Sequence, residues 1–226
     1  MRTVISRRPV RAGLLATAVA GLLCLGATGC EGDGDEEAAD KAVAGTALCG
    51  GDAVSAQASK ALKVITGSSR FGTTAEKSTV AQAATDLVEA FPVPTGGRDD
   101  VCRIYTADGT PDFAIRVTWG LVDGPPTGTP AADFTVLKMG ERTLAAANRA
   151  SIRFACRSDK LVGAAGVAHI VIGVERWGMP TEPEGDVEAL KDAYATVAHS
   201  VSLAMAKELR CEKNGGLPER PVLDPA

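Results

Sequence analysis

Apolar residues recur at helical spacing in two stretches of the first half of the chain. In residues 52–66 they follow one another every three or four positions, and Gly67 is typical of a helix end. A second stretch begins at Thr73, which forms a capping box with Glu76, and it stops before Pro92. These patterns predict two N-terminal helices.

The middle of the chain changes to an alternation of apolar and polar residues, which is typical of half-buried strands. Five segments show it, the third of them weakly: 101–106, 113–119, 134–139, 150–156 and 167–177. A last helix is expected from Asp186 to about Cys211, and its length of roughly 38 Å would cross a whole sheet. Residues 68–71 and the Gly- and Pro-rich segment 123–130 are expected to be loops.

Helices placed before and after a run of antiparallel strands define the α+β class. We expect a meandering antiparallel sheet of about five strands, with the two N-terminal helices and the long C-terminal helix packed on it. This single domain is predicted to cover residues 49–216, and residues 217–226 are expected to form an extended tail.

The first 29 residues have the composition of a secretory signal peptide. They hold four arginines and no acidic residue, and from Gly13 onward they are apolar or small. The apolar run of about 17 residues is at the lower limit for a permanent membrane span. No second run of that length follows, so we do not expect the rest of the chain to be embedded in a membrane. Arg7 and Arg8 hint at twin-arginine export, but Pro9 and Arg11 after them favour the general secretory route.

Residues 25–30, LGATGC, resemble the lipobox of bacterial lipoproteins. In that family the cysteine receives a diacylglyceryl group and becomes the first residue after cleavage, so the resemblance implies lipidation of Cys30. Ala27 departs from the leucine most common at its position, and Cys24 is a poorer candidate because Leu23 before it is too large for the cleavage site. Because two or more acyl chains hold a protein stably, we expect it on the extracytoplasmic face of the cell membrane. An ordinary secreted protein is the alternative.

Charge separates the segment after Cys30 from the rest. Six of the ten residues 31–40 are acidic, which predicts a solvated tether over residues 30–48 that spans roughly 20–25 Å as a flexible coil. Removal of the first 29 residues takes away four of 24 basic and none of 28 acidic residues, so the formal charge falls from −4 to −8. That sign argues against nucleic acid as a partner.

Four cysteines lie in the expected domain: Cys49, Cys102, Cys156 and Cys211. An even number in an exported chain predicts two disulfides, and spacings above 50 residues argue against a metal site. The first choice is Cys49–Cys102 with Cys156–Cys211, each closing a loop that contributes roughly 4 kcal/mol. The nested pairing, Cys49–Cys211 with Cys102–Cys156, is close behind.

The layout resembles that of small, function-unassigned envelope lipoproteins of actinobacteria. Those proteins also combine an acidic tether, a first helix opened by a cysteine, a strand cysteine and a terminal helix; the corresponding features here are the tether, Cys49-Gly50-Gly51, Cys102 and the last helix. The resemblance covers roughly residues 30–216 in outline. It favours the first disulfide pairing and implies no activity.

Candidate chemistry is sparse. His169 lies in the last strand, on the face opposite Ile170, and is expected to be exposed or at a sheet edge. His199 lies on the long helix beside its apolar stripe. Ser200 follows it directly, but adjacent helix positions point about 100° apart, so the two do not form a nucleophile–base pair. We predict no catalytic residue, no metal site and no cofactor.

Other polar and aromatic positions give weaker indications. The carboxylate pairs Asp99–Asp100 and Glu182–Glu184 are expected to be solvated loop charges, and Gly50–Gly51 lacks the lysine of a phosphate-binding loop. Trp119 and Trp177 are candidate anchors for a partner, although covering the sheet edge and core is their more ordinary role.

The anchor, the tether and the sparse chemistry together predict a non-enzymatic binding module for a protein partner or ligand at the cell surface. The alternative is an envelope hydrolase that acts on cell-wall material or peptides. A transporter-associated solute receptor ranks last, because two-lobed receptors need a longer chain.

Overall fold

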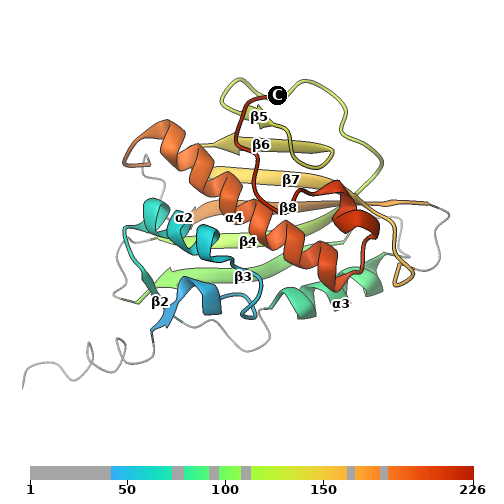
Figure 1. Ribbon diagram of the computed structural model, residues 1–226, viewed down its shortest axis with the longest axis horizontal. Helices are drawn as coiled ribbons and strands as arrows, with labels where there is room; N and C mark the ends of the chain where they lie inside the picture. Colours follow the sequence, from blue (N-terminus) through green and yellow to red (C-terminus); the bar gives the residue numbers. More distant parts are fainter. Residues whose placement is uncertain (1–41, 73–78, 92–96, 108–112, 162–165, 179–182) are drawn as a thin grey trace, which may run out of the picture. The chain divides into compact units, whose positions relative to one another are not determined.

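The computed structural model describes residues 42–226 without 73–78, 92–96, 108–112, 162–165 and 179–182. In these described residues eight strands form one sheet, and each strand is antiparallel to its neighbours (Figure 1). The strands are β1 (Val43–Ala44), β2 (Arg70–Gly72), β3 (Arg98–Thr106), β4 (Phe113–Val122), β5 (Thr135–Leu137), β6 (Arg142–Ala146), β7 (Arg149–Cys156) and β8 (Ala168–Gly178). Their spatial order is β1-β2-β3-β4-β8-β7-β6-β5. Two four-stranded meanders are therefore joined side by side through β4 and β8.

Three α-helices of the described residues lie on one face of this sheet: α2 (Ala56–Thr66), α3 (Val80–Ala90) and α4 (Val187–Glu208) (Figure 1). Each begins at a residue whose side chain accepts a backbone N–H of the first turn, namely Ser55, Thr79 and Asp186. Gly67 ends α2 in the left-handed conformation, at φ 75°. Local sequence signals therefore set these boundaries.

Alternation of side chains places the core between the helices and the sheet. In β7 every second residue is buried, and the same period continues through the first half of β8. Ile152, Ile170 and Ile172 have no exposed surface and face the helices. The residues between them point to the opposite face of the sheet, which carries none of the three helices.

Helix α4 is buried over most of its circumference because it lies between the sheet and the other helices. It packs against β6, β7 and β8 on one side and against α2 and α3 on the other. Four of its polar residues, Thr196, His199, Ser200 and Ser202, are consequently buried, and buried polar groups need hydrogen-bond partners. Ser200 meets this need by donating to the carbonyl of Ala53 and accepting the N–H of Ser55, which ties the start of α2 to α4.

The two disulfides are Cys49–Cys102 and Cys156–Cys211, which confirms the first of the two expected pairings. The first joins the segment before α2 to β3. The second joins the end of β7 to the residues after α4, so each bridge fastens an element of the helical layer to the sheet.

The α+β class and the long C-terminal helix are confirmed, but the expected number of about five strands is wrong. The missed strands are β1, β2 and β6. Residues 68–71 are not simply a loop, because Phe71 belongs to β2 and is completely buried. Strands β1 and β2 have only two and three residues, which is too short to show an alternation. Strand β6 has five residues, but its buried positions are threonine and alanine, so it has no pattern of large apolar residues.

The helix boundaries also differ from those expected. Helix α2 starts after Ser55 instead of at Asp52, α3 starts after Thr79 instead of at Thr73, and strand β2 separates them. The capping box at Thr73 and the proline stop at Pro92 fall outside the described residues. No helix among those described is long and apolar enough to cross a membrane.

Both expected ends of the domain lie further out. Residues 42–48 were assigned to the tether, yet Val43 pairs with Phe71 and Leu48 is buried in the core. At the other end, Leu217 is buried and the Ala226 N–H donates to the carbonyl of Val136 in β5. The tail is thus extended but packed along the sheet edge, where it covers part of an otherwise open strand.

Candidate interaction surface

The face of the sheet opposite the helices is covered on one half by the β4–β5 connection. Strands β4 and β5 run in the same direction with three strands between them, so the connection must return along the length of the sheet. Arg142 of β6 donates to the carbonyls of Pro126, Thr127 and Gly128, and Arg153 of β7 donates to that of Gly124. These bonds hold the connection against β6 and β7.

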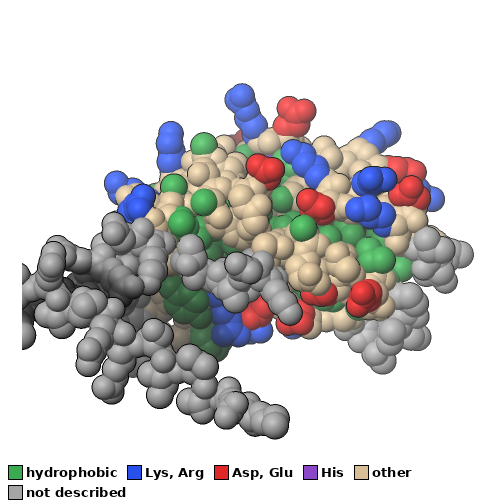
Figure 2. All heavy atoms as spheres, turned by 90° about the horizontal axis from the view of Figure 1, so that it is seen from below, with side chains coloured by type: hydrophobic (Ala, Val, Ile, Leu, Met, Phe, Trp, Pro, Cys, Tyr) green, Lys and Arg blue, Asp and Glu red, His purple; other side chains and the backbone are tan. Residues whose placement is uncertain are grey.

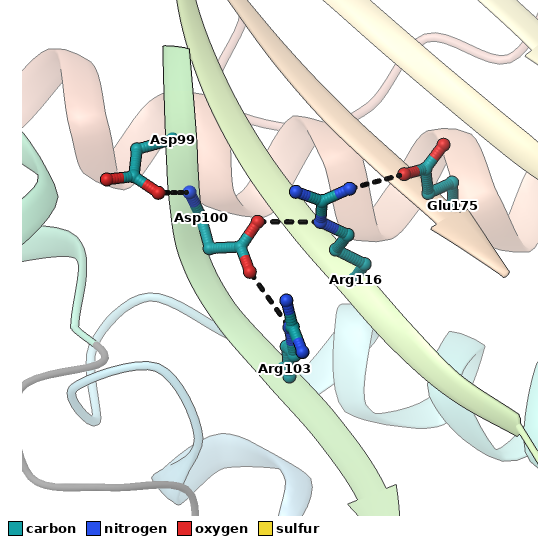
Figure 3. A network of polar contacts seen from close by, with 5 residues as sticks. All are labelled: Asp99, Asp100, Arg103, Arg116 and Glu175. Atoms are coloured by element: carbon teal, nitrogen blue, oxygen red, sulfur yellow. Dashed lines mark hydrogen bonds and ion pairs between the residues drawn. The ribbon is translucent and has the colours of Figure 1, made fainter. Parts of the chain in front are cut away.

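The other half of this face, over β3, β4 and β8, carries a polar network at its centre (Figure 3). Asp100 accepts from Nε of Arg103 at 2.8 Å and from Nε of Arg116 at 2.6 Å. Arg116 also lies 3.6 Å from the carboxylate of Glu175, its cross-strand partner on β8. Asp99 turns away and accepts the backbone N–H of Asp100.

The sequence explains why Asp100 stands between the two arginines. Arg103 and Arg116 are directly opposite each other on β3 and β4, and like charges in that position repel. An irregularity in the pairing between Asp100 and Cys102 re-aims the side chains at this point. It brings one carboxylate within hydrogen-bonding distance of both guanidinium groups, which removes the repulsion.

Two exposed aromatic rings flank the network. Tyr105 and Trp177 are 43% and 44% exposed, whereas the remaining exposed large apolar residues of the described chain, Val64 and Val187, belong to helices α2 and α4. The guanidinium of Arg103 lies over the Trp177 ring, 4.5 Å from its centroid. The pKa of Arg103 is raised, mainly by its hydrogen bond to Asp100 and to a smaller extent by one to Tyr105. Arg103 therefore contacts both rings as well as the network.

We call this area the bare sheet surface and define it by Asp100, Arg103, Tyr105, Arg116, Thr118, Glu175 and Trp177. Its two arginines are balanced by two carboxylates. On the face of the molecule seen in Figure 2, basic and acidic side chains are likewise interspersed. Within these seven residues the formal charges cancel, while Arg98, exposed on the same face of β3 opposite Gly120, adds a positive charge at the margin. The bare sheet surface thus combines ion-paired donors and acceptors with two aromatic rings.

The structure separates the two histidines and gives each a partner. His169 is on the face opposite Ile170, as expected, but it lies on the interior strand β8 and is mostly buried, with Nδ1 2.9 Å from Glu141. His199 is 3% exposed, and its Nε2 lies 2.8 Å from the carbonyl of Pro218. Burial lowers the pKa of His199, which favours the neutral ring.

The remaining candidates divide between core and surface. Trp119 is buried beneath the helices, while Trp177 is on the bare sheet surface. Asp99–Asp100 belong to strand β3 and not to a loop. Glu184 is exposed, as expected of a solvated charge, and Glu182 lies outside the described residues.

The expected signal peptide, Cys30 and the acidic residues 31–40 also lie outside the described part of the chain. Within that part, no cluster of three His, Cys, Asp or Glu side chains is placed to hold a metal ion. Comparison of the chain with protein-family models, with curated proteins and with solved structures finds no match in any of the three.

Sequence reasoning identified Trp177 as a candidate but missed Arg103, Tyr105 and Arg116. The alternation within each strand puts Arg103 and Tyr105 on one face, and Arg116 on the polar face of β4. The strand order was not known, however, and only the pairing of β4 with both β3 and β8 brings these side chains together.

Proposed function

We propose that the protein is a lipid-anchored, non-enzymatic binding module on the extracytoplasmic face of the cell membrane, and that the bare sheet surface is its contact area. The observation that carries this proposal is the placement of Tyr105, Arg103 and Trp177 together on the half of the sheet face that carries none of the described helices. Tyrosine, tryptophan and arginine are the residues that contribute most at binding interfaces.

The N-terminal sequence and the disulfides support the same proposal. A signal peptide, a lipobox-like segment ending in Cys30 and a strongly acidic segment after it are expected of a tethered lipoprotein. Two disulfides fit an oxidising compartment outside the cytoplasm. Metabolic labelling with a palmitate analogue tests the anchor, since label should enter the wild type and be lost in Cys30→Ala.

Photo-crosslinking in intact cells tests the contact area. A photoreactive phenylalanine at position 105 is expected to give specific adducts, because Tyr105 is exposed at the edge of the bare sheet surface. The same group at position 187, exposed at the start of α4, is the matched control. Equal adduct formation at both positions, or none at position 105, would contradict the assignment.

The alternative, an envelope hydrolase, has one observation in its favour. The His169–Glu141 pair resembles a general base held by a carboxylate. The hydrogen bonds found for His169 and His199 in the described residues involve no Ser, Thr or Cys side chain. The binding module therefore has the stronger support.

A further inference from the structure

We infer that the bare sheet surface binds a neutral glycan chain, and this inference rests on the proposed function. Three features of the surface point to this ligand class: its charge balance, its pattern of hydrogen-bond donors and acceptors, and its exposed aromatic rings.

The charge balance argues for an uncharged ligand. Both arginines of the bare sheet surface are already paired with Asp100 or Glu175, so an anionic partner would have to displace a carboxylate. A cationic partner would be drawn by the acidic remainder of the chain instead. A neutral, polar ligand avoids both penalties.

The pattern of donors and acceptors suits hydroxyl groups. A guanidinium only donates and a carboxylate only accepts, whereas each sugar hydroxyl does both. Asp100, Arg116 and Glu175 come from three adjacent strands, whose spacing is about 4.8 Å, and they alternate acceptor, donor, acceptor. Their ion pairs already hold them in place, which lowers the entropy lost when a ligand binds.

The aromatic rings offer surface for the apolar face of a sugar. Tyr105 and Trp177 stand on β3 and β8, two strand spacings or about 10 Å apart. Ala114, the residue paired with Trp177 on the strand between them, is small. The negative face of an aromatic ring attracts the polarised C–H groups of a pyranose. The guanidinium of Arg103 lies over one face of the Trp177 ring, so a sugar would stack on the part of this ring that is exposed. The two rings would then contact two positions along one chain.

A protein partner fits the same surface less well. The centre of a protein–protein interface is depleted of lysine, aspartate and glutamate and enriched in apolar area, although arginine is common there. Here four charged side chains occupy the centre, and the exposed large apolar side chains of the described residues are the two flanking aromatics and two valines on helices. The arrangement is that of a polar platform with aromatic edges.

The test uses the detergent-solubilised, full mature lipoprotein, immobilised on a column. Glycans released from the envelope of the same cells are separated into a neutral and an acidic pool and are passed over it. We expect retention of material from the neutral pool. Titration of the retained fraction should show at least about tenfold weaker binding to Trp177→Ala, since loss of a stacked ring costs on the order of 1.4 kcal/mol.

Two variants control for folding. Trp177→Phe keeps a ring and should bind within about threefold of the wild type. Val187→Ala removes an exposed apolar side chain from α4 and should bind like the wild type. All variants should retain both disulfides and the circular dichroism spectrum of the wild type.

Retention of the acidic pool alone, no retention of either pool, or equal titrations of the wild type and Trp177→Ala would overturn the glycan assignment. Protein adducts from position 105 without glycan retention would overturn it while leaving the proposed binding module standing. Absence of both adducts and retention would overturn the two proposals together.

Discussion

The Arg116–Asp100 ion pair is the part of the network whose contribution to stability can be worked out most directly. Its atoms are 2.6 Å apart, and the two side chains are 33% and 24% exposed. Partly exposed pairs of this kind contribute on the order of 1 kcal/mol or less, because solvent screens the charges and both side chains lose freedom. We therefore expect a coupling free energy of about 1 kcal/mol at most.

The assay is a double-mutant cycle. Urea unfolding of the wild type, Arg116→Ala, Asp100→Ala and the double variant gives the coupling as the difference from additivity. Arg116→Ala alone should destabilise only slightly, because Asp100 keeps its bond to Arg103. The same variant should strongly reduce binding at the bare sheet surface, because it removes the central donor.

A coupling above about 3 kcal/mol would refute this reasoning, since values of that size belong to buried pairs that brace a fold. So would a variant that unfolds normally and binds its ligand like the wild type. A coupling of that size would mean that the network mainly stabilises the fold. Unchanged binding would mean that its side chains are exposed charges without a role in binding.

Three further predictions concern the fold. Replacing Cys156 and Cys211 together by alanine should lower the free energy of unfolding by about 4 kcal/mol, because the bridge closes a loop with a sequence separation of 55. A loss below about 1 kcal/mol would show that the bridge does not stabilise the protein by constraining the unfolded chain. Truncation after Gly216 removes the buried Leu217 and should lower the free energy of unfolding, measured with heat or urea, by at least about 2 kcal/mol. An unchanged unfolding midpoint would contradict the conclusion that the tail is packed against the domain. Because burial lowers the pKa of His199, the unfolded chain takes up a proton at a higher pH than the folded chain does, and stability should fall as the pH drops below about 6.5. In His199→Gln the free energy of unfolding, measured between about pH 7 and pH 5, should depend less on pH. A pH dependence equal to that of the wild type would argue against this role of His199.

The parts of the fold that sequence reasoning predicted are those with long periodic signals. Residues 150–156 and 167–177 carry an apolar residue at every second position over most of their length, and they correspond to β7 and β8 within one residue. The long helix was expected from Asp186, and Asp186 is its N-cap, whose side chain accepts the N–H of Ala189. Each of these signals is local, because it depends on a repeat of two or of 3.6 residues within one element.

The features that were missed depend on contacts between distant elements. Strand β2 is identified by its pairing with β1 and β3, and Phe71 is buried because those neighbours and the helices surround it. The tail after Leu217 carries no periodic signal, and its order comes from contacts with α4 and β5. The bare sheet surface likewise exists because β8 returns to pair with β4.

The intact mass of the protein extracted from membranes, together with its count of free thiols, tests the central claim most directly. The account predicts a chain that starts at Cys30, carries acyl groups on that residue and is four hydrogens lighter than its reduced form, with no free thiol. A full-length chain of 226 residues, recovered unacylated from the cytoplasm with all six thiols free, would contradict it.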